Sequence, residues 1–150
     1  MAQNMPVAGT IIPNLLMHPI VEAIIIHAVS PWDRRGLLYE YWPLFSNVFK
    51  VGRTNFLLRR KYEWQRQCFP MVQIWTMYWE VPFAAKFEKL IHAHYTYIEP
   101  AWIMPMPCTF CGVCHQELFD LLVVVGLTEL DRVVSHYCAR LGWPFIRKYV

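Results

Sequence analysis

The clearest structural signal in this chain lies in residues 36–60, which read GLLYEYWPLFSNVFKVGRTNFLLRR. Residues 37–42 are apolar and aromatic, which favours a β-strand whose alternate side chains share one face. Residues 43–47 predict a turn, and residues 48–51 predict a second strand that ends at Gly52. We therefore expect these two strands to form a hairpin.

Working outward from the hairpin, Thr54 or Asn55 can cap a helix that runs to about residue 68. Next, a strand is predicted at residues 71–79 and a helix that begins near Pro82. A further strand is predicted at residues 118–125, followed by a helix at residues 128–141 that Thr128 can cap. The mixed order predicts an α+β fold, namely a small three-stranded antiparallel sheet flanked by helices, with a C-terminal strand/helix extension. We expect an irregular N-terminal extension at residues 1–35, a domain at residues 36–125 and a packed helix within residues 126–150.

The composition indicates one folded domain. The chain has 150 residues, of which 56% are hydrophobic and only 17% are charged, so material for a core is plentiful and intrinsic disorder is excluded. We see no signal peptide and no transmembrane segment, which predicts an intracellular location, with the nucleus as one option, and no membrane partner. In a reducing compartment the five cysteines are expected to be free thiols or metal ligands.

Positive charge is concentrated in one stretch of the chain. Only Glu63 is acidic there, and the basic side chains are Lys50, Arg53, Arg59, Arg60, Lys61 and Arg66. Such a concentration is typical of proteins that bind a phosphate-bearing partner. A solvated helix face has the same appearance, so charge alone leaves both interpretations open.

Several short motifs follow one another between residues 36 and 119. They are GLLY at 36–39, FKVGRTN at 49–55, the pair Arg59 and Arg60, then Trp64 and Cys68, FEKLIH at 87–92 and HQELF at 115–119. In this order they resemble one branch of the GIY-YIG nuclease superfamily, the phage T-five-type DNA-binding domain that also occurs in fungal proteins. Members of that branch read KIG where other relatives read YIG, and they carry ERLIH and HxEWF segments. Leu118 stands here where that last segment has tryptophan.

The resemblance implies a DNA-binding protein that is a divalent-metal-dependent endonuclease. Tyr39 matches the GIY tyrosine, and Lys50 stands where the second tyrosine would be. Arg60 matches the phosphate-binding arginine, and Glu88 matches the glutamate that holds Mg²⁺ or Mn²⁺. The implied catalytic residues are therefore Tyr39, Lys50, Arg60 and Glu88, and the basic residues from Lys50 to Arg66 are the expected contacts to nucleic acid.

A second group of residues has metal-binding chemistry. Cys108, Cys111, Cys114 and His115 lie close together in the sequence, and thiolate and imidazole ligands suit tetrahedral zinc. Cys68 is a further candidate ligand from the first helix. Because zinc sites usually draw ligand pairs from separated segments, free buried thiols are the alternative. Cys111 to His115 also match the short c-type haem attachment pattern, which the lack of a targeting segment argues against.

Three hypotheses about function follow from the sequence. The first is a Mg²⁺-dependent endonuclease, and the second is a catalytically inactive module that holds nucleic acid without cutting it. The third is a zinc-stabilised domain for protein interaction. The placement of Glu88 discriminates among them, because a nuclease requires its carboxylate to share one concave surface with Tyr39, Lys50 and Arg60.

Overall fold

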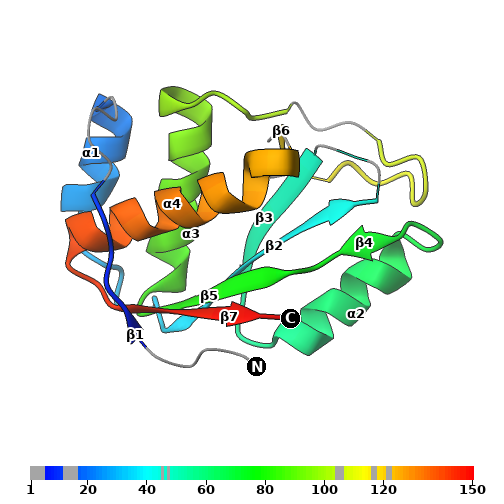
Figure 1. Ribbon diagram of the computed structural model, residues 1–150, viewed down its shortest axis with the longest axis horizontal. Helices are drawn as coiled ribbons and strands as arrows, with labels where there is room; N and C mark the ends of the chain where they lie inside the picture. The colour runs from blue at the N-terminus through cyan, green and yellow to red at the C-terminus, as the bar shows by residue number, and fades with distance from the viewer. Residues whose placement is uncertain are drawn as a thin grey trace.

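The computed structural model describes residues 6–11, 17–44, 46, 48–103, 107–115, 118–120 and 123–150, without the side chains of residues 123–128. The described strands are β1 (Pro6–Val7), β2 (Gly36–Pro43), β3 (Val48–Thr54), β4 (Gln73–Ile74), β5 (Met77–Val81), β6 (Leu118–Asp120) and β7 (Phe145–Tyr149). The described helices are α1 (Pro19–Ile26), α2 (Leu57–Gln67), α3 (Ala84–Ala93) with a π-helical continuation η1 (His94–Ile98), and α4 (Val123–Leu141). Figure 1 shows their arrangement.

The strands form one antiparallel sheet in the order β1-β7-β5-β2-β3-β6, with β4 paired to the end of β2. The predicted hairpin is confirmed as β2 and β3, and the α+β class is confirmed with it. The predicted small three-stranded sheet is too small, because β2, β3 and β5 form only its centre. Residues 145–149 add a strand beside β5 that local sequence patterns did not reveal.

The N-terminal region also belongs to the fold. The expected irregular extension at residues 1–35 contributes β1, which pairs with β7, and α1, which packs against α3. The predicted strand at residues 71–79 is interrupted, because its first part is the short β4 and its second part is β5.

The region after residue 118 differs most from the sequence-based prediction. The strand predicted at residues 118–125 stops at Asp120, and Val123 already begins α4, so Thr128 lies inside the helix instead of capping it. A run of valines favours a strand locally, but tertiary packing overrides local propensity. The helix carries an apolar stripe, since Leu130, Val133, Val134 and Tyr137 are buried in the core.

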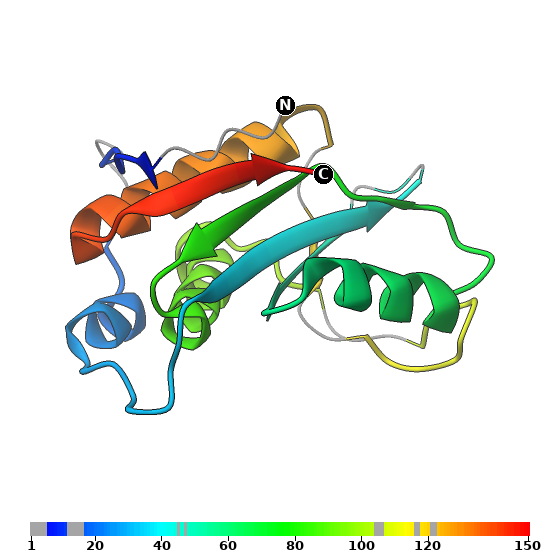
Figure 2. The same cartoon turned by 90° about the horizontal axis from the view of Figure 1, so that it is seen from below.

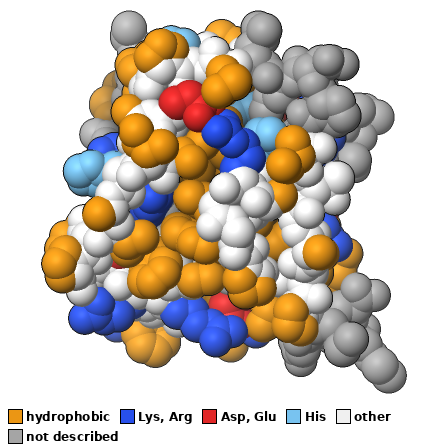
Figure 3. Space-filling model, turned by 90° about the vertical axis from the view of Figure 1, so that its left-hand side faces the viewer, with side chains coloured by type: hydrophobic (Ala, Val, Ile, Leu, Met, Phe, Trp, Pro, Cys, Tyr) orange, Lys and Arg blue, Asp and Glu red, His pale blue; other side chains and the backbone are white. Residues whose placement is uncertain are grey.

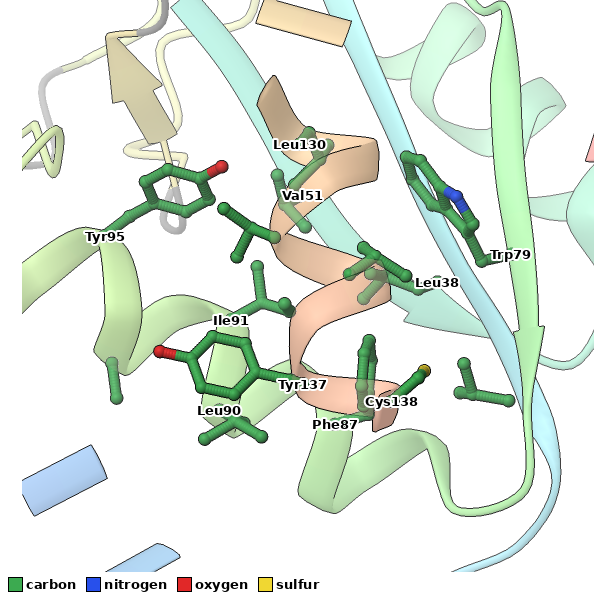
Figure 4. Packing of buried hydrophobic residues seen from close by; sticks show 14 of the residues in the cluster. Leu38, Val51, Trp79, Phe87, Leu90, Ile91, Tyr95, Leu130, Tyr137 and Cys138 are labelled. Carbon is green, nitrogen blue, oxygen red and sulfur yellow. The ribbon is translucent and has the colours of Figure 1, made fainter. Parts of the chain in front are cut away.

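The sheet has a different helix layer on each face. The main core lies between one face and the helices α3 and α4, where Leu38 and Trp79 meet Phe87 and Tyr137 (Figure 4). Helix α2 lies on the opposite face, as Figure 2 shows from below. A smaller cluster forms there, in which Tyr39, Tyr41 and Trp75 pack with Leu57 and Trp64. Alternation along β2 and β3 therefore sends their side chains into two separate layers.

One carboxyl group is buried within the sheet. Glu40 of β2 is fully buried, and its Oε1 accepts hydrogen bonds from Thr76 Oγ1 at 2.9 Å and from the Met77 backbone N–H at 3.2 Å. Its Oε2 has no hydrogen-bond partner among the described residues. Burial raises the pKa of Glu40 from 4.5 to about 7, against the opposing effect of those hydrogen bonds. Glu40 is therefore a group whose ionisation opposes folding.

None of the helices in the described part of the chain is both long enough and apolar enough to cross a membrane.

Candidate functional site

The four side chains that the resemblance implies as catalytic, Tyr39, Lys50, Arg60 and Glu88, lie around one hollow of about 300 Å³. We call it the basic hollow, and the residues that line it are Tyr39, Lys50, Gly52, Arg53, Arg60, Trp64 and Glu88. They come from β2, β3, α2 and α3, so the hollow forms only when both helix layers are assembled on the sheet. Three of these side chains are cationic and one is anionic, which makes the hollow suited to an anion.

Tyr39 forms the floor of the basic hollow. It is paired across the sheet with Gly52, and its hydroxyl oxygen accepts a hydrogen bond of 3.0 Å from Trp64 Nε1. A Cβ atom on Gly52 would lie only 2.6 Å from that oxygen, so the absence of a side chain at Gly52 lets the phenol lie across β3. Because the indole N–H can only donate, the Tyr39 oxygen is the acceptor in this hydrogen bond.

Lys50 stands beside Tyr39 on the same face of the sheet. It lies on β3 opposite Tyr41 and is only 4% exposed. Its ammonium is 4.8 Å from the centre of the Trp64 ring, within the range of a cation–π interaction. The aromatic contact holds the charged end of Lys50 at the wall of the hollow.

Helix α2 supplies Arg60 to the basic hollow. Arg60 Nη1 donates to Glu63 Oε2 at 3.1 Å, whereas Arg60 Nε is buried and has no hydrogen-bond partner among the described residues. An unsatisfied guanidinium N–H is costly when it is buried, and an anionic oxygen would satisfy it. Arg60 therefore retains donor capacity for a phosphate.

A second hollow of about 460 Å³ continues from the first at the start of α2 and shares Arg53 and Arg60 with it. The residues that line it are Arg53, Thr54, Asn55, Phe56, Arg59, Arg60 and Glu63. The predicted cap of α2 is wrong, because Phe56 holds the N-cap position and no side chain caps the helix. Thr54 Oγ1 instead accepts from the Phe56 backbone N–H at 3.1 Å, just before the helix. The exposed Phe56 ring and the N-terminus of α2 therefore both border this second hollow.

Glu88 reaches the basic hollow from the opposite helix layer. In the described structure β6 covers β3 only at residues 48–50, so α3 can approach the remaining edge of β3. There His92 bonds to the Val51 carbonyl at 2.9 Å, and Glu88 Oε1 lies 3.4 Å from Arg53 Nε. The Glu88 side chain is 19% exposed, so its carboxylate opens toward the hollow rather than into bulk solvent.

The position of α3 depends on a buried aspartate outside the helix. Asp33 is 3% exposed, and its two oxygens accept the backbone N–H groups of Ala85 at 2.9 Å and Lys86 at 2.8 Å. These are donors that the first turn of a helix leaves unsatisfied. Asp33 therefore fixes the start of α3 and, through the helix, the position of Glu88.

The structure brings together some of the predicted nucleic-acid contacts and separates others. Lys50, Arg53, Arg59 and Arg60 line the two connected hollows, whereas Lys61 and Arg66 line neither. Sequence reasoning did not assign Trp64 or Glu63 a place in the site. Their spacing from Arg60 on α2 was the available signal, because residues three or four apart on a helix are neighbours.

Three cysteines and one histidine form a separate cluster at the far end of α2. The Sγ atoms of Cys68, Cys108 and Cys111 and a ring nitrogen of His115 all lie within 4.8 Å of one another. The predicted zinc set needs one correction, because Cys114 is exposed and lies outside this cluster while Cys68 takes its place. Burial and the Lys50 charge lower the pKa of His115, which favours the neutral imidazole that binds metals.

Another hollow, of about 480 Å³, lies between α1 and α3. Two of its charged groups already make structural hydrogen bonds. Asp33 caps α3, and Lys86 Nζ donates to the backbone carbonyls of Ile25 and His27. Figure 3 shows the side of the molecule on which α1 lies, where hydrophobic side chains cover much of the surface. Among the described residues, this hollow lacks a group comparable to Tyr39, Lys50, Arg60 and Glu88, so the basic hollow remains the candidate site.

These features define an α+β protein with a cationic hollow assembled from two helix layers. The model of the family described as "Meiotically up-regulated gene 113" matches residues 46–139, which is more than half of the 150 residues. The chain belongs to this family. The matched region includes Lys50, Arg60, Glu88 and the Cys/His cluster, but Tyr39 lies before it. No curated protein and no solved structure matches the chain.

Proposed function

We propose that this protein binds DNA through its phosphodiester backbone and cleaves it with the help of a divalent metal ion. The observation that carries the proposal is the shared hollow of Tyr39, Lys50, Arg60 and Glu88. The central order of strand, strand, helix, strand and helix, formed by β2, β3, α2, β5 and α3, also supports the resemblance to the GIY-YIG nucleases.

Binding follows from the charges of the two connected hollows. Arg60 presents a planar set of donors that matches two phosphate oxygens, and Lys50 adds a compact positive charge beside it. Arg53 and Arg59 extend this surface along the start of α2, where the neighbouring phosphates of a strand would lie. Four cationic contacts to duplex DNA imply that log K falls with log salt with a slope of about −3 to −4.

The residues of the basic hollow also fit a metal-assisted hydrolysis. Glu88 is the only carboxylate among the residues that line it, and Mg²⁺ accepts one or two carboxylates together with substrate phosphate. When bound there, Mg²⁺ or Mn²⁺ would supply Lewis-acid neutralisation of the phosphoryl oxygens. Arg60 would hold the phosphate in place, and Tyr39 would orient the attacking water through its hydroxyl. The Trp64 N–H fixes the position of that hydroxyl.

One observation favours binding without cleavage as the second candidate. Glu88 lies 3.4 Å from Arg53, and this ion pair competes with a metal ion for the same carboxylate. Lys50 also lacks the neutral hydroxyl that a second tyrosine would offer. In this alternative Glu88 orders Arg53 for phosphate binding, and no metal is needed.

The decisive experiment compares cleavage and binding in the same variants. With Mg²⁺ or Mn²⁺, the wild-type protein should nick supercoiled plasmid, Glu88→Gln should abolish nicking while still binding DNA, and Arg60→Ala should weaken both activities. Lys89→Ala is the matched control for loss of positive charge, because Lys89 is exposed on α3 and lines the hollow between α1 and α3. If the wild-type protein binds DNA but never nicks it, the second candidate stands; DNA binding that ignores salt would contradict both.

A further inference from the structure

The Cys/His cluster has the dimensions of a tetrahedral metal site. Cys68 Sγ lies 3.7 Å from Cys111 Sγ, and His115 Nε2 lies 3.1 Å from the first sulfur and 3.2 Å from the second. In a tetrahedral zinc site, Zn–S bonds of about 2.3 Å and Zn–N bonds of about 2.0 Å separate two sulfurs by about 3.8 Å and sulfur from nitrogen by about 3.5 Å. For Cys68, Cys111 and His115 the observed distances differ from these values by only a few tenths of an ångström, and the Cys108 sulfur lies within 4.8 Å of the other three ligand atoms.

The backbone around Cys108 and Cys111 is shaped for holding a metal. The Gly112 N–H donates to the Cys108 carbonyl at 2.8 Å, and Gly112 itself has a φ of +70°, a left-handed conformation that glycine adopts readily. The Cys108 N–H donates in turn to the Val113 carbonyl at 3.0 Å, which closes a tight loop. The backbone N–H groups of Cys111 and Phe110 are directed at the Cys108 sulfur. Such N–H groups stabilise a thiolate ligand.

The fourth ligand comes from a distant part of the sequence. Cys68 follows the last residue of α2 and is completely buried, whereas Cys108, Cys111 and His115 come from the segment that leads into β6. This satisfies the usual rule that a zinc site draws ligands from separated segments, which the sequence alone did not satisfy. Three thiol groups and an imidazole are a soft ligand set that selects zinc over magnesium.

We propose that Cys68, Cys108, Cys111 and His115 hold a structural zinc ion that fastens the loop at residues 107–115 to the end of α2. A closed set of four protein ligands leaves no open coordination position, so the ion stabilises the fold and takes no direct part in a reaction. The inference does not depend on the proposed function, because it concerns a different group of residues and is tested by metal content.

The test measures metal in the full-length protein, purified without chelator from cells grown with added zinc. We expect one zinc per chain by inductively coupled plasma mass spectrometry, and near-complete loss of zinc in Cys68→Ser and His115→Ala. Cys114→Ser and Cys138→Ser are the matched controls and should keep the full amount, because both sulfurs lie outside the cluster. His115→Cys replaces one zinc ligand with another and should retain the metal that His115→Ala loses.

Loss of a ligand can unfold a small metal-dependent protein, so a measurement on the wild-type chain is added. Cobalt(II) exchanged into the wild-type protein should give the intense visible bands of a tetrahedral site and a thiolate-to-metal charge-transfer band. Substoichiometric zinc, iron in place of zinc, or an octahedral cobalt spectrum would overturn the proposal. Equal loss of zinc in Cys114→Ser and Cys68→Ser would overturn it as well.

Discussion

Gly52→Ala is the smallest change that should disturb the basic hollow. The added Cβ would lie 2.6 Å from the Tyr39 hydroxyl oxygen and 2.8 Å from Cζ. Carbon contacts are favourable from about 3.5 Å, so the phenol has to withdraw by roughly 0.9 Å. It has little room to do so, because Tyr39 is 3% exposed and its ring centre lies 5.2 Å from that of Trp75.

The cost of this displacement can be worked out from its parts. Overpacking of a buried site costs about 1–3 kcal/mol, and weakening the hydrogen bond from Trp64 costs about 1 kcal/mol. Alanine in a strand is intrinsically better than glycine by about 0.5–1 kcal/mol, which offsets part of the loss. We therefore expect Gly52→Ala to lower the free energy of unfolding by about 2 kcal/mol and Tm by roughly 4–8 °C.

A double-mutant cycle tests the stated cause. Tyr39→Leu lacks both atoms that the new Cβ would meet, so adding Gly52→Ala to that variant should be neutral or stabilising. Urea denaturation followed by circular dichroism measures all four proteins. An equal penalty for Gly52→Ala in the two backgrounds would refute the reasoning, because the cost would then not arise from contact with Tyr39.

Three further predictions concern side chains around the site. Asp33→Ala removes the acceptors for the first turn of α3 and should lower the free energy of unfolding by about 1–2 kcal/mol in denaturant titrations. The stability of Asp33→Asn should lie between those of the wild type and Asp33→Ala, and an unchanged midpoint for Asp33→Ala would contradict the capping role. Since the pKa of Glu40 is raised to about 7, its contribution to stability is complete below about 4.5 and is lost as pH rises through 7. Glu40→Gln should therefore flatten a fall of up to about 3 kcal/mol in unfolding free energy between about pH 4.5 and pH 7, and parallel curves for the two proteins would argue against it. Glu63→Gln releases Arg59 and Arg60 from their ion pairs at 2.9 and 3.1 Å and should tighten DNA binding in a fluorescence anisotropy titration; weaker binding would show that Glu63 positions these arginines.

Local patterns predicted the elements whose signals lie within a few residues. The hairpin of β2 and β3 and the helices α2 and α3 follow from local patterns that the packed structure keeps. Glu88 and Arg60 were singled out by motif order, and the structure places both at the basic hollow. In these cases the local preference and the tertiary environment agree.

The features that the sequence did not reveal depend on contacts between distant segments. β7 forms by pairing with β5 (Met77–Val81), and the local sequence of residues 145–149 does not predict this pairing. By sequence Cys114 is as good a candidate ligand as Cys108 and Cys111. In the structure Cys114 is exposed, and Cys68 belongs to the cluster instead. The need for glycine at position 52 likewise arises from Tyr39, which lies on another strand.

The candidate site and the Cys/His cluster are physically connected through one residue of α2. Trp64 donates to Tyr39, contacts the Lys50 ammonium with its ring, and meets the His115 ring edge-on at a centroid distance of 5.2 Å. Arg60, Trp64 and Cys68 are spaced four residues apart, so they follow one another along one side of α2. Arg60 lines the basic hollow, Cys68 belongs to the Cys/His cluster, and Trp64 lies between them. A metal ion that fixes Cys68 and His115 would therefore also restrict Trp64. Since Trp64 positions the Tyr39 hydroxyl, removal of that metal should loosen the basic hollow, although none of the four proposed metal ligands lines it.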